Sequence, residues 1–182
     1  TEKEVCEKRG KLLKTHGFEV SKKDQNLPFM YWAAKMHKNP VSERYITTSL
    51  KTITKSLSQL VCKCLTLVQE QVKRHCEFRE KKDGIHRFWI ASSSEPVLQC
   101  VRQLNLLRVA KNLATYDFST LYTNIPHKRL KDQMRWVIDL AFDNNKLYPF
   151  IEVWSKGASW KKTQNKNKTR ISREKLVELV DL

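Results

Sequence analysis

A run of apolar residues at helical spacing, from Ile53 to Cys76, limits the fold of this chain more than any other feature of the sequence. Residues that recur every three or four positions fall on one side of an α-helix, and here the pattern continues for about six turns. A helix of that length buries its apolar face only if other elements cover it. We therefore expect a long scaffold helix with these inward residues: Ile53, Leu57, Leu60, Val61, Cys64, Leu65, Val68 and Val72.

The length and the charge of the chain restrict its size class and its partners. Its 182 residues suffice for one domain with a core, or for parts of two subdomains. The 35 Lys and Arg residues exceed the 19 Asp and Glu residues, which gives a formal net charge of +16. Such a charge favours a nucleic-acid partner, because binding releases condensed counterions. The sequence has no apolar run long enough to cross a bilayer and no signal-peptide pattern, so we expect an intracellular protein without a membrane partner.

The five cysteines are dispersed along the chain and odd in number, unlike the dense, even sets of secreted disulfide frameworks. Cys62 and Cys64 lie on the predicted long helix, two residues apart. That spacing turns their side chains about 200° away from each other. It is also not the CxxC spacing of zinc sites. We expect free structural thiols at Cys6, Cys62, Cys64, Cys76 and Cys100.

The segment from Leu27 to Ser49 has the pattern of a β-hairpin. An aromatic run precedes a turn signal at Asn39–Pro40, and an alternating strand pattern follows it. Basic groups spread across such a hairpin can hold a triphosphate or a template strand. A solvated basic face on a surface hairpin explains the same pattern. The basic residues are Lys35, His37, Lys38 and Arg44.

Local signals predict shorter helices and a further strand. Ser92 to Ser94 offer N-cap hydroxyl groups before Glu95 and Pro96, so a helix is expected to begin there. Ser172 is the expected N-cap of the last helix. The other predicted segments are a helix from Thr1 to His16, a short strand from Ile85 to Ala91, a helix from Pro126 to Phe142 and a helix from Ile171 to Leu182.

A single acid, Asp117, stands at the end of a predicted buried strand that begins at Leu113. A turn follows, and Pro126 can open the next helix. In this geometry a carboxylate can hold a divalent ion while the backbone amides of the turn face an anion. Phosphoryl transfer requires both a bound divalent ion and groups that stabilise the phosphate anion. A carboxylate that caps the turn, or that pairs with a lysine, is the alternative.

The segment DFSTLYTNIP, from Asp117 to Pro126, resembles the first catalytic palm motif of reverse transcriptases. Its sequence is most similar to the corresponding motif of Penelope-like retroelements. The resemblance extends from about Leu27 to the C-terminus. It implies that Asp117 ligates catalytic Mg²⁺ with the carbonyl of Phe118 as a second ligand. It also implies that the ring of Tyr122 closes off the 2′ side of the incoming nucleotide.

The hairpin is similar to the fingers motifs of the same family, in which basic residues contact the incoming nucleotide. Lys35 and Arg44 match those basic positions. The sequence departs from the family at Ala34 and Tyr45, where prolines are usual. The resemblance further implies that backbone amides of the palm motif approach the triphosphate, namely those of Ser119, Thr120 and Leu121.

The stretch from Trp154 to Arg170 is the most basic and the least patterned of the chain. Tryptophans interleaved with lysines can track a single strand through charge and stacking. A disordered connection explains the composition equally well. Besides the nucleotide-binding residues, the predicted nucleic-acid contacts are Lys38, Trp160, Lys161 and Lys162.

The acids that would complete a polymerase site do not follow Asp117. A two-metal mechanism needs carboxylates around two ions about 3.5–4 Å apart. In reverse transcriptases the remaining acids come from a paired-aspartate turn after a glycine-containing motif, but this chain has no Asp-Asp pair and its last glycine is Gly157. We therefore expect an α+β, partial right-hand polymerase with three regions: an N-terminal helical segment (1–26), a fingers-like region with the hairpin and the long helix (27–112), and a truncated palm (113–182).

Three functions remain open from the sequence. The first is the fingers and early palm of an RNA-directed DNA polymerase, with Mg²⁺, an RNA template, a DNA primer, deoxynucleotide triphosphates and a nuclear location. The second is a non-catalytic, basic nucleic-acid-binding remnant of a decayed element. The third is a helical protein-interaction domain. It explains the long helix, but under this hypothesis the palm-like motif is a coincidence.

Overall fold

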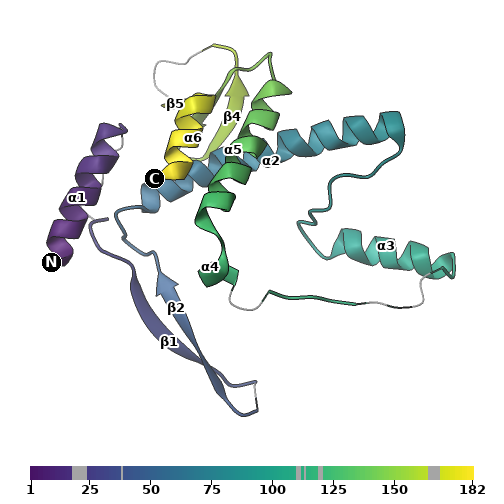
Figure 1. Cartoon of the computed structure of the whole chain (residues 1–182), viewed down its shortest axis with the longest axis horizontal. Helices are drawn as coiled ribbons and strands as arrows, with labels where there is room; N and C mark the ends of the chain where they lie inside the picture. The colour runs from purple at the N-terminus through teal and green to yellow at the C-terminus, as the bar shows by residue number, and fades with distance from the viewer. Residues whose placement is uncertain (18–23, 38, 110–111, 113, 119–120, 164–168) are drawn as a thin grey trace.

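The computed structural model describes the chain apart from residues 18–23, 38, 110–111, 113, 119–120 and 164–168, and it leaves out the side chains of 122 and 123. The fold is α+β, with helices and two small antiparallel sheets (Figure 1). In chain order the elements are α1 (Glu2–Thr15), β1 (Phe29–Lys35), β2 (Ser42–Thr48), α2 (Lys55–Asp83), α3 (Glu95–Leu106), α4 (Leu121–Asn124), α5 (His127–Asp143), β3 (Phe150–Trp154), β4 (Gly157–Lys161), β5 (Thr169–Ile171) and α6 (Arg173–Asp181).

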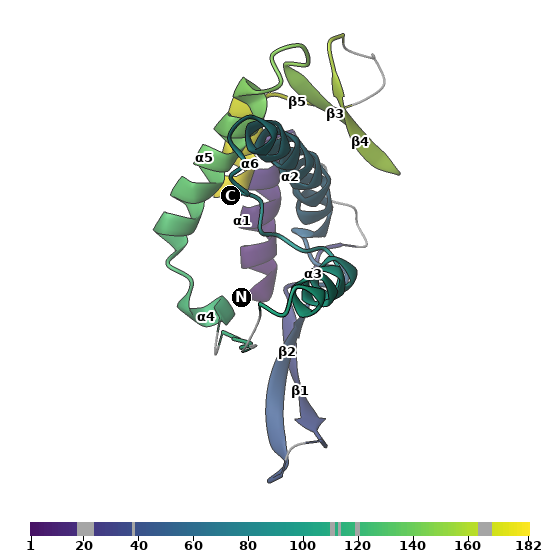
Figure 2. The ribbon, with the colours of Figure 1, turned by 90° about the vertical axis from the view of Figure 1, so that its right-hand side faces the viewer.

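The scaffold helix predicted from the periodicity is α2, which is 29 residues long and therefore extends past Cys76. It ends at Gly84, whose φ of 71° lies in the left-handed region that glycine adopts without strain. Its inward side chains include Leu57, Cys64 and Val68, all buried. Helices α5 and α6 pack on α2 and on each other, and β3 and β4 also contact α2. Figure 2 shows these elements gathered around α2.

The three-stranded sheet has the order β4-β3-β5, and both pairings are antiparallel. Ile151 in the middle strand is fully buried and lies opposite Trp160 on β4 and Ile171 on β5. Lys63 of α2 donates hydrogen bonds to the carbonyl oxygens of Trp154 (3.0 Å) and Ser155 (2.8 Å), which ties the β3–β4 turn to the helix. The interpretation of residues 154–170 as a disordered connection is therefore wrong for β4 and the start of β5.

Helix α1 belongs to the same core as the rest of the chain. Cys6 and Leu13 are buried in a cluster that also holds residues of α2, α5, α6 and the sheet. The ring of His16 contacts Glu178 of α6, with 2.6 Å between Nδ1 and Oε1. The predicted helix at the N-terminus is confirmed. The three predicted regions thus share one core, and their boundaries stay a prediction.

The remaining predicted helices are also confirmed. Helix α3 has Pro96 in its first turn, α5 begins directly after Pro126, and α6 begins after Ser172. The hydroxyl oxygen of Ser172 accepts a hydrogen bond from the backbone N–H of Lys175 (3.2 Å), as expected for an N-cap.

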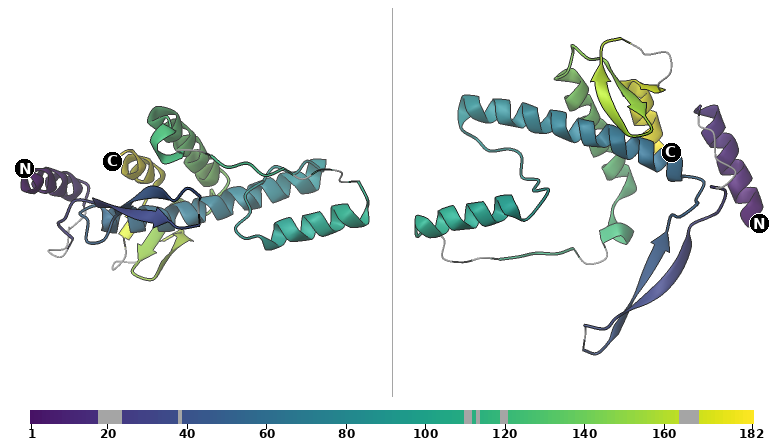
Figure 3. Two further views of the ribbon diagram at one scale, coloured as in Figure 1. Left: turned by 90° about the horizontal axis from the view of Figure 1, so that it is seen from below. Right: turned by 180° about the vertical axis from the view of Figure 1, so that it is seen from behind.

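Two elements project from this body, the β1–β2 hairpin and α3 (Figures 1 and 3). The hairpin confirms the strand-turn-strand prediction, with a register that runs from the pair Phe29–Thr48 to the pair Lys35–Ser42. Every residue of α3 is exposed. Their apolar side chains therefore contribute little to the core.

The structure contradicts the predicted buried strand before Asp117. Residues 114–118 have no regular secondary structure, and Tyr116 is 94% exposed. A strand forms when its backbone N–H and C=O groups pair with a neighbour. Among the described residues, strand pairing occurs in the hairpin, in the β3–β5 sheet and in an isolated bridge between Asn26 and Thr52, and none of these pairs with this segment.

The predicted strand from Ile85 to Ala91 is also wrong, because these residues form an irregular segment in which Arg87 and Phe88 are half-buried and the others are exposed. Arg87 donates two hydrogen bonds to the carboxylate of Asp83, at 2.7 and 2.6 Å, and they lower the pKa of that group to about 2. These bonds connect the irregular segment to Asp83, the last residue of α2.

Candidate nucleic-acid interface

The hairpin brings Lys35 and Arg44 to one face. Residues that pair directly in an antiparallel ladder have side chains on the same side of the sheet, and the sides alternate along each strand. Lys35 pairs with Ser42 and Arg44 pairs with Ala33, so the two cations are diagonal neighbours. Arg44 is exposed and Lys35 is half-buried. The structure therefore places together two residues that the sequence predicted to act together.

The same face carries two aromatic rings. Phe29 and Tyr31 alternate in phase with Lys35, and their ring centroids lie 6.4 Å apart. They are 60% and 47% exposed. From Phe29 to Lys35 the strand extends about 20 Å. Rings and cations in this order suit a single nucleic-acid strand, because bases stack on rings while phosphates bind cations. We call this surface, formed by Phe29, Tyr31, Lys35 and Arg44, the basic face.

The opposite face of the hairpin differs in charge. It consists of the remaining strand residues, among which Trp32 pairs directly with Tyr45 and Glu43 is the charged member. Trp32 and Tyr45 are 62% and 67% exposed. This face offers rings without a cation on either strand, so phosphate binding favours the basic face. Its residues are Met30, Trp32, Ala34, Glu43, Tyr45 and Thr47.

Asp117 lies in an exposed irregular segment, and its Oδ1 accepts a hydrogen bond from the backbone N–H of Phe118 (2.8 Å). This local bond agrees with the alternative in which the carboxylate caps the turn. The side chain of Phe118 is 77% exposed, and Leu121 begins the short helix α4. Ser119 and Thr120 lie outside the described residues, as does the side chain of Tyr122. The predicted roles of these residues stay predictions.

The described donors do not fit a two-metal centre. Mg²⁺ takes near-octahedral oxygen ligands, and two ions need several carboxylates between them. Within the part of the chain that the structure describes, no group of three His, Cys, Asp or Glu side chains is placed to hold a metal ion. Asp117 and the carbonyl of Phe118 are therefore at most part of a ligand set and do not form a two-metal centre by themselves.

The predicted contacts near the three-stranded sheet are only partly exposed. The ring of Trp160 packs edge-on against the ring of Phe142 in the core, with centroids 4.8 Å apart. A ring held there cannot stack on a base without losing that contact. Lys161 and Lys162 are exposed, and Lys162 Nζ lies 5.5 Å from the centroid of the Tyr148 ring. Lys38 lies outside the described residues.

The chain matches no family model, no curated protein and no solved structure. The resemblance to Penelope-like reverse transcriptases therefore depends on the motif residues and stays a prediction. Within the described residues, no helix is both long and apolar enough to cross a membrane.

Phe29 and Tyr31 were not predicted from the sequence as site residues. They belong to the aromatic run of the hairpin, and the strand register decides which of its rings share a face with Lys35. The signal was present in the sequence, because residues two, four and six positions before Lys35 lie on its side of the strand. Counting back from Lys35 gives Ala33, Tyr31 and Phe29.

Proposed function

We propose that this chain is the fingers and early palm of a retroelement RNA-directed DNA polymerase, and that it holds a nucleic-acid strand on the basic face of the hairpin. The observation that supports this most is that Lys35, Arg44, Phe29 and Tyr31 share one side of the hairpin, on which Arg44 and both rings are exposed. The formal charge of +16 supports a polyanionic partner. The palm-like motif that begins at Asp117 supports the family.

In this proposal the cations of the basic face bind phosphate groups of the template or of the incoming nucleotide, and Arg44 can bind a phosphate through two parallel hydrogen bonds. Phe29 and Tyr31 stack on bases. In the intact enzyme, Asp117 and the Phe118 carbonyl belong to a Mg²⁺ site that further acids complete. An RNA template, a DNA primer, deoxynucleotide triphosphates and a nuclear location are parts of the same proposal.

The test measures affinity for a fluorescent single-stranded RNA against salt concentration. Replacing both Lys35 and Arg44 by Ala should lower the affinity at least about tenfold, because two phosphate contacts are lost. It should also reduce the slope of log K against log salt by about 1.4, or roughly 0.7 for each contact. The matched control replaces Lys81 and Lys82, two exposed lysines at the far end of α2. Equal losses in both double variants would contradict a site on the hairpin.

The rings of the hairpin give a second arm of this test. Tyr31→Ala should lower the affinity roughly tenfold while the salt slope stays unchanged, since stacking releases no counterions. Tyr45→Ala, on the opposite face, is the control. If Tyr45→Ala weakens binding as much as Tyr31→Ala does, the strand does not follow the basic face.

A non-catalytic nucleic-acid-binding protein is the second candidate, and the local hydrogen bond of Asp117 favours it. Both candidates bind nucleic acid, and they differ in what the palm-like motif does. A protein-interaction domain predicts instead that affinity for RNA is weak at all salt concentrations. The salt titration therefore separates the third candidate from the first two.

We expect no primer extension when the 182-residue chain is incubated with Mg²⁺, deoxynucleotides and a primed RNA template. The reason is that a two-metal site needs several carboxylates, and the described residues contain no group of three His, Cys, Asp or Glu side chains placed to hold a metal ion. Extension would be measured on a denaturing gel, with an active reverse transcriptase as the positive control. Products longer than the primer that disappear in an Asp117→Ala variant would contradict this prediction.

A further inference from the structure

The far end of the β1–β2 hairpin is apolar and exposed. Met36 directly follows β1 and Val41 directly precedes β2, so their side chains flank the turn. They are 77% and 58% exposed. Because the hairpin projects from the body (Figures 1 and 3), its turn is the part of it that lies farthest from the core. We call Met36 and Val41 the apolar tip, and both side chains are accessible to a partner of the hairpin.

The apolar tip continues the surface proposed to hold a nucleic-acid strand. Lys35, directly before Met36, is the cation of the basic face nearest the turn, and His37 in the turn is exposed. The described turn residues, 36, 37 and 39–41, include no acid. A polyanion that follows the basic face therefore reaches the tip without meeting a negative charge there.

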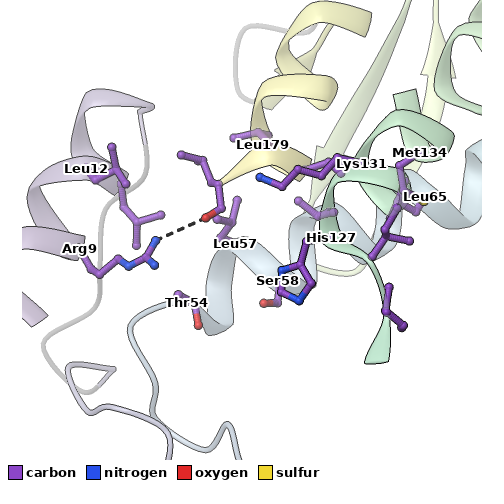
Figure 4. Close-up of a pocket in the computed structure, with 16 residues that line it drawn as sticks. Arg9, Leu12, Thr54, Leu57, Ser58, Leu65, His127, Lys131, Met134 and Leu179 are labelled. Carbon is purple, nitrogen blue, oxygen red and sulfur yellow. Dashed lines mark hydrogen bonds between the residues drawn. The ribbon is translucent and has the colours of Figure 1, made fainter. Parts of the chain in front are cut away.

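Other uncovered apolar surfaces of the described chain lack this combination of features. The groove between α1, α2, α5 and α6 has a volume of about 490 Å³ and mostly aliphatic walls, without Phe, Tyr or Trp (Figure 4). The apolar side of α3, which includes Val97 and Val101, has no aromatic residue either. Nucleic-acid bases stack on aromatic rings, so neither surface suits a strand as well as the hairpin does.

The two faces of the hairpin suit the two strands of a duplex unequally. The basic face offers rings and cations to one strand. The opposite face offers the exposed rings of Trp32 and Tyr45, but its charged residue is Glu43, which repels phosphate groups. When a duplex meets the hairpin end-on, only one of its strands is therefore held by charge. The last base pair of that duplex then faces the tip.

We propose that the apolar tip packs against the last base pair of a duplex, at the point where one strand leaves the duplex and continues along the basic face. The ligand is thus a junction between a duplex and a single strand. Apolar side chains, methionine among them, insert at base steps and partly unstack them. Packing Met36 and Val41 on the base pair also removes their apolar surface from water. This role depends on the function proposed for the basic face, which holds the single strand.

The experiment compares the affinity of the whole chain for two fluorescent RNAs at one salt concentration. One RNA is a single strand, and the other is the same strand extended by a duplex at either end. The unaltered chain should bind the junction more tightly. Replacing Met36 and Val41 together by Ser should lower the affinity for the junction about fivefold or more and leave the affinity for the single strand unchanged. The salt slopes should also stay the same, because neither residue is charged.

A fluorescent base analogue in the last base pair reports unstacking directly. Its fluorescence should rise when the unaltered chain binds and should not rise with the tip variant. The matched control replaces Leu106 and Leu107 by Ser, two leucines at the end of α3 that are 84% and 70% exposed. This control should leave both affinities unchanged.

Equal affinity of the unaltered chain for the two RNAs, or equal losses in the tip and control variants, would overturn the proposal. If the tip variant instead loses binding to anionic phospholipid vesicles while both RNA affinities stay unchanged, the tip contacts a membrane surface and not a base pair. Failure of the function proposed for the basic face has a different signature, because it appears as a single-strand affinity that does not depend on Lys35 and Arg44.

Discussion

Replacing Leu176 by Ala should lower the free energy of unfolding by about 2–5 kcal/mol, the range found when a buried leucine is truncated and a cavity remains. Leu176 is 0% exposed on α6 and belongs to the core cluster shared with α2, α5 and the sheet. Because native domains are stable by only about 5–15 kcal/mol, this single change removes a large share of the total.

Urea unfolding followed by circular dichroism measures the change, with Leu106→Ala as the control. Leu106 is 84% exposed, on the side of α3 away from Val97 and Val101, so its truncation should change stability by no more than about 0.5 kcal/mol. In thermal unfolding, each kcal/mol should appear as a shift of about 2–4 °C for a domain of this size. Equal losses at the two leucines would show that α6 is not part of the cooperative core.

Strong local signals made part of this fold predictable. Helix α2 follows from a long apolar periodicity, and α6 follows from a serine N-cap before its apolar residues. The hairpin follows from a turn at Asn39–Pro40 between two alternating segments. In each case the residues of the element and its immediate neighbours are sufficient to predict its secondary structure.

The three-stranded sheet was not predictable in the same way. Strands β4 and β5 are short, and Thr169, Arg170 and Lys161 give them a polar composition. Pairing with β3 stabilises them, as does packing of Trp160 on Phe142. Those contacts join segments that are distant from each other in the sequence, so no local pattern predicts them.

In the candidate site, too, some features were predictable from local sequence and others depend on contacts between distant segments. The alternation around Lys35 and Arg44 predicted a basic hairpin, and the register of the hairpin then placed both cations on one face. Asp117 shows the limit of local pattern, because its apolar approach predicted a strand and no described strand pairs with it. A motif can thus indicate a family while the backbone around it depends on pairing partners elsewhere in the chain.

Cys64 and Cys62 should differ in reaction rate with thiol reagents at pH 8 by roughly a thousandfold or more. Cys62 is exposed and Cys64 is 0% exposed, as expected for thiols on opposite sides of α2. Burial raises the pKa of Cys64 to about 12, although nearby Lys63 acts in the opposite direction. The thiolate is the reactive form, and raising a cysteine pKa from its ordinary value near 8.5 to about 12 lowers the thiolate fraction at pH 8 by roughly a thousandfold.

Mass spectrometry of peptides after a short pulse of reagent measures both rates in one sample. Adding denaturant should expose Cys64 and make it react, and Cys62→Ser provides a sample without the fast thiol. The raised pKa also predicts a pH effect. The unfolded chain releases the Cys64 proton first, so this contribution to stability is present below about pH 9 and is lost toward pH 12. Rapid labelling of Cys64 in the folded protein would contradict its burial and its packing in the α2 core.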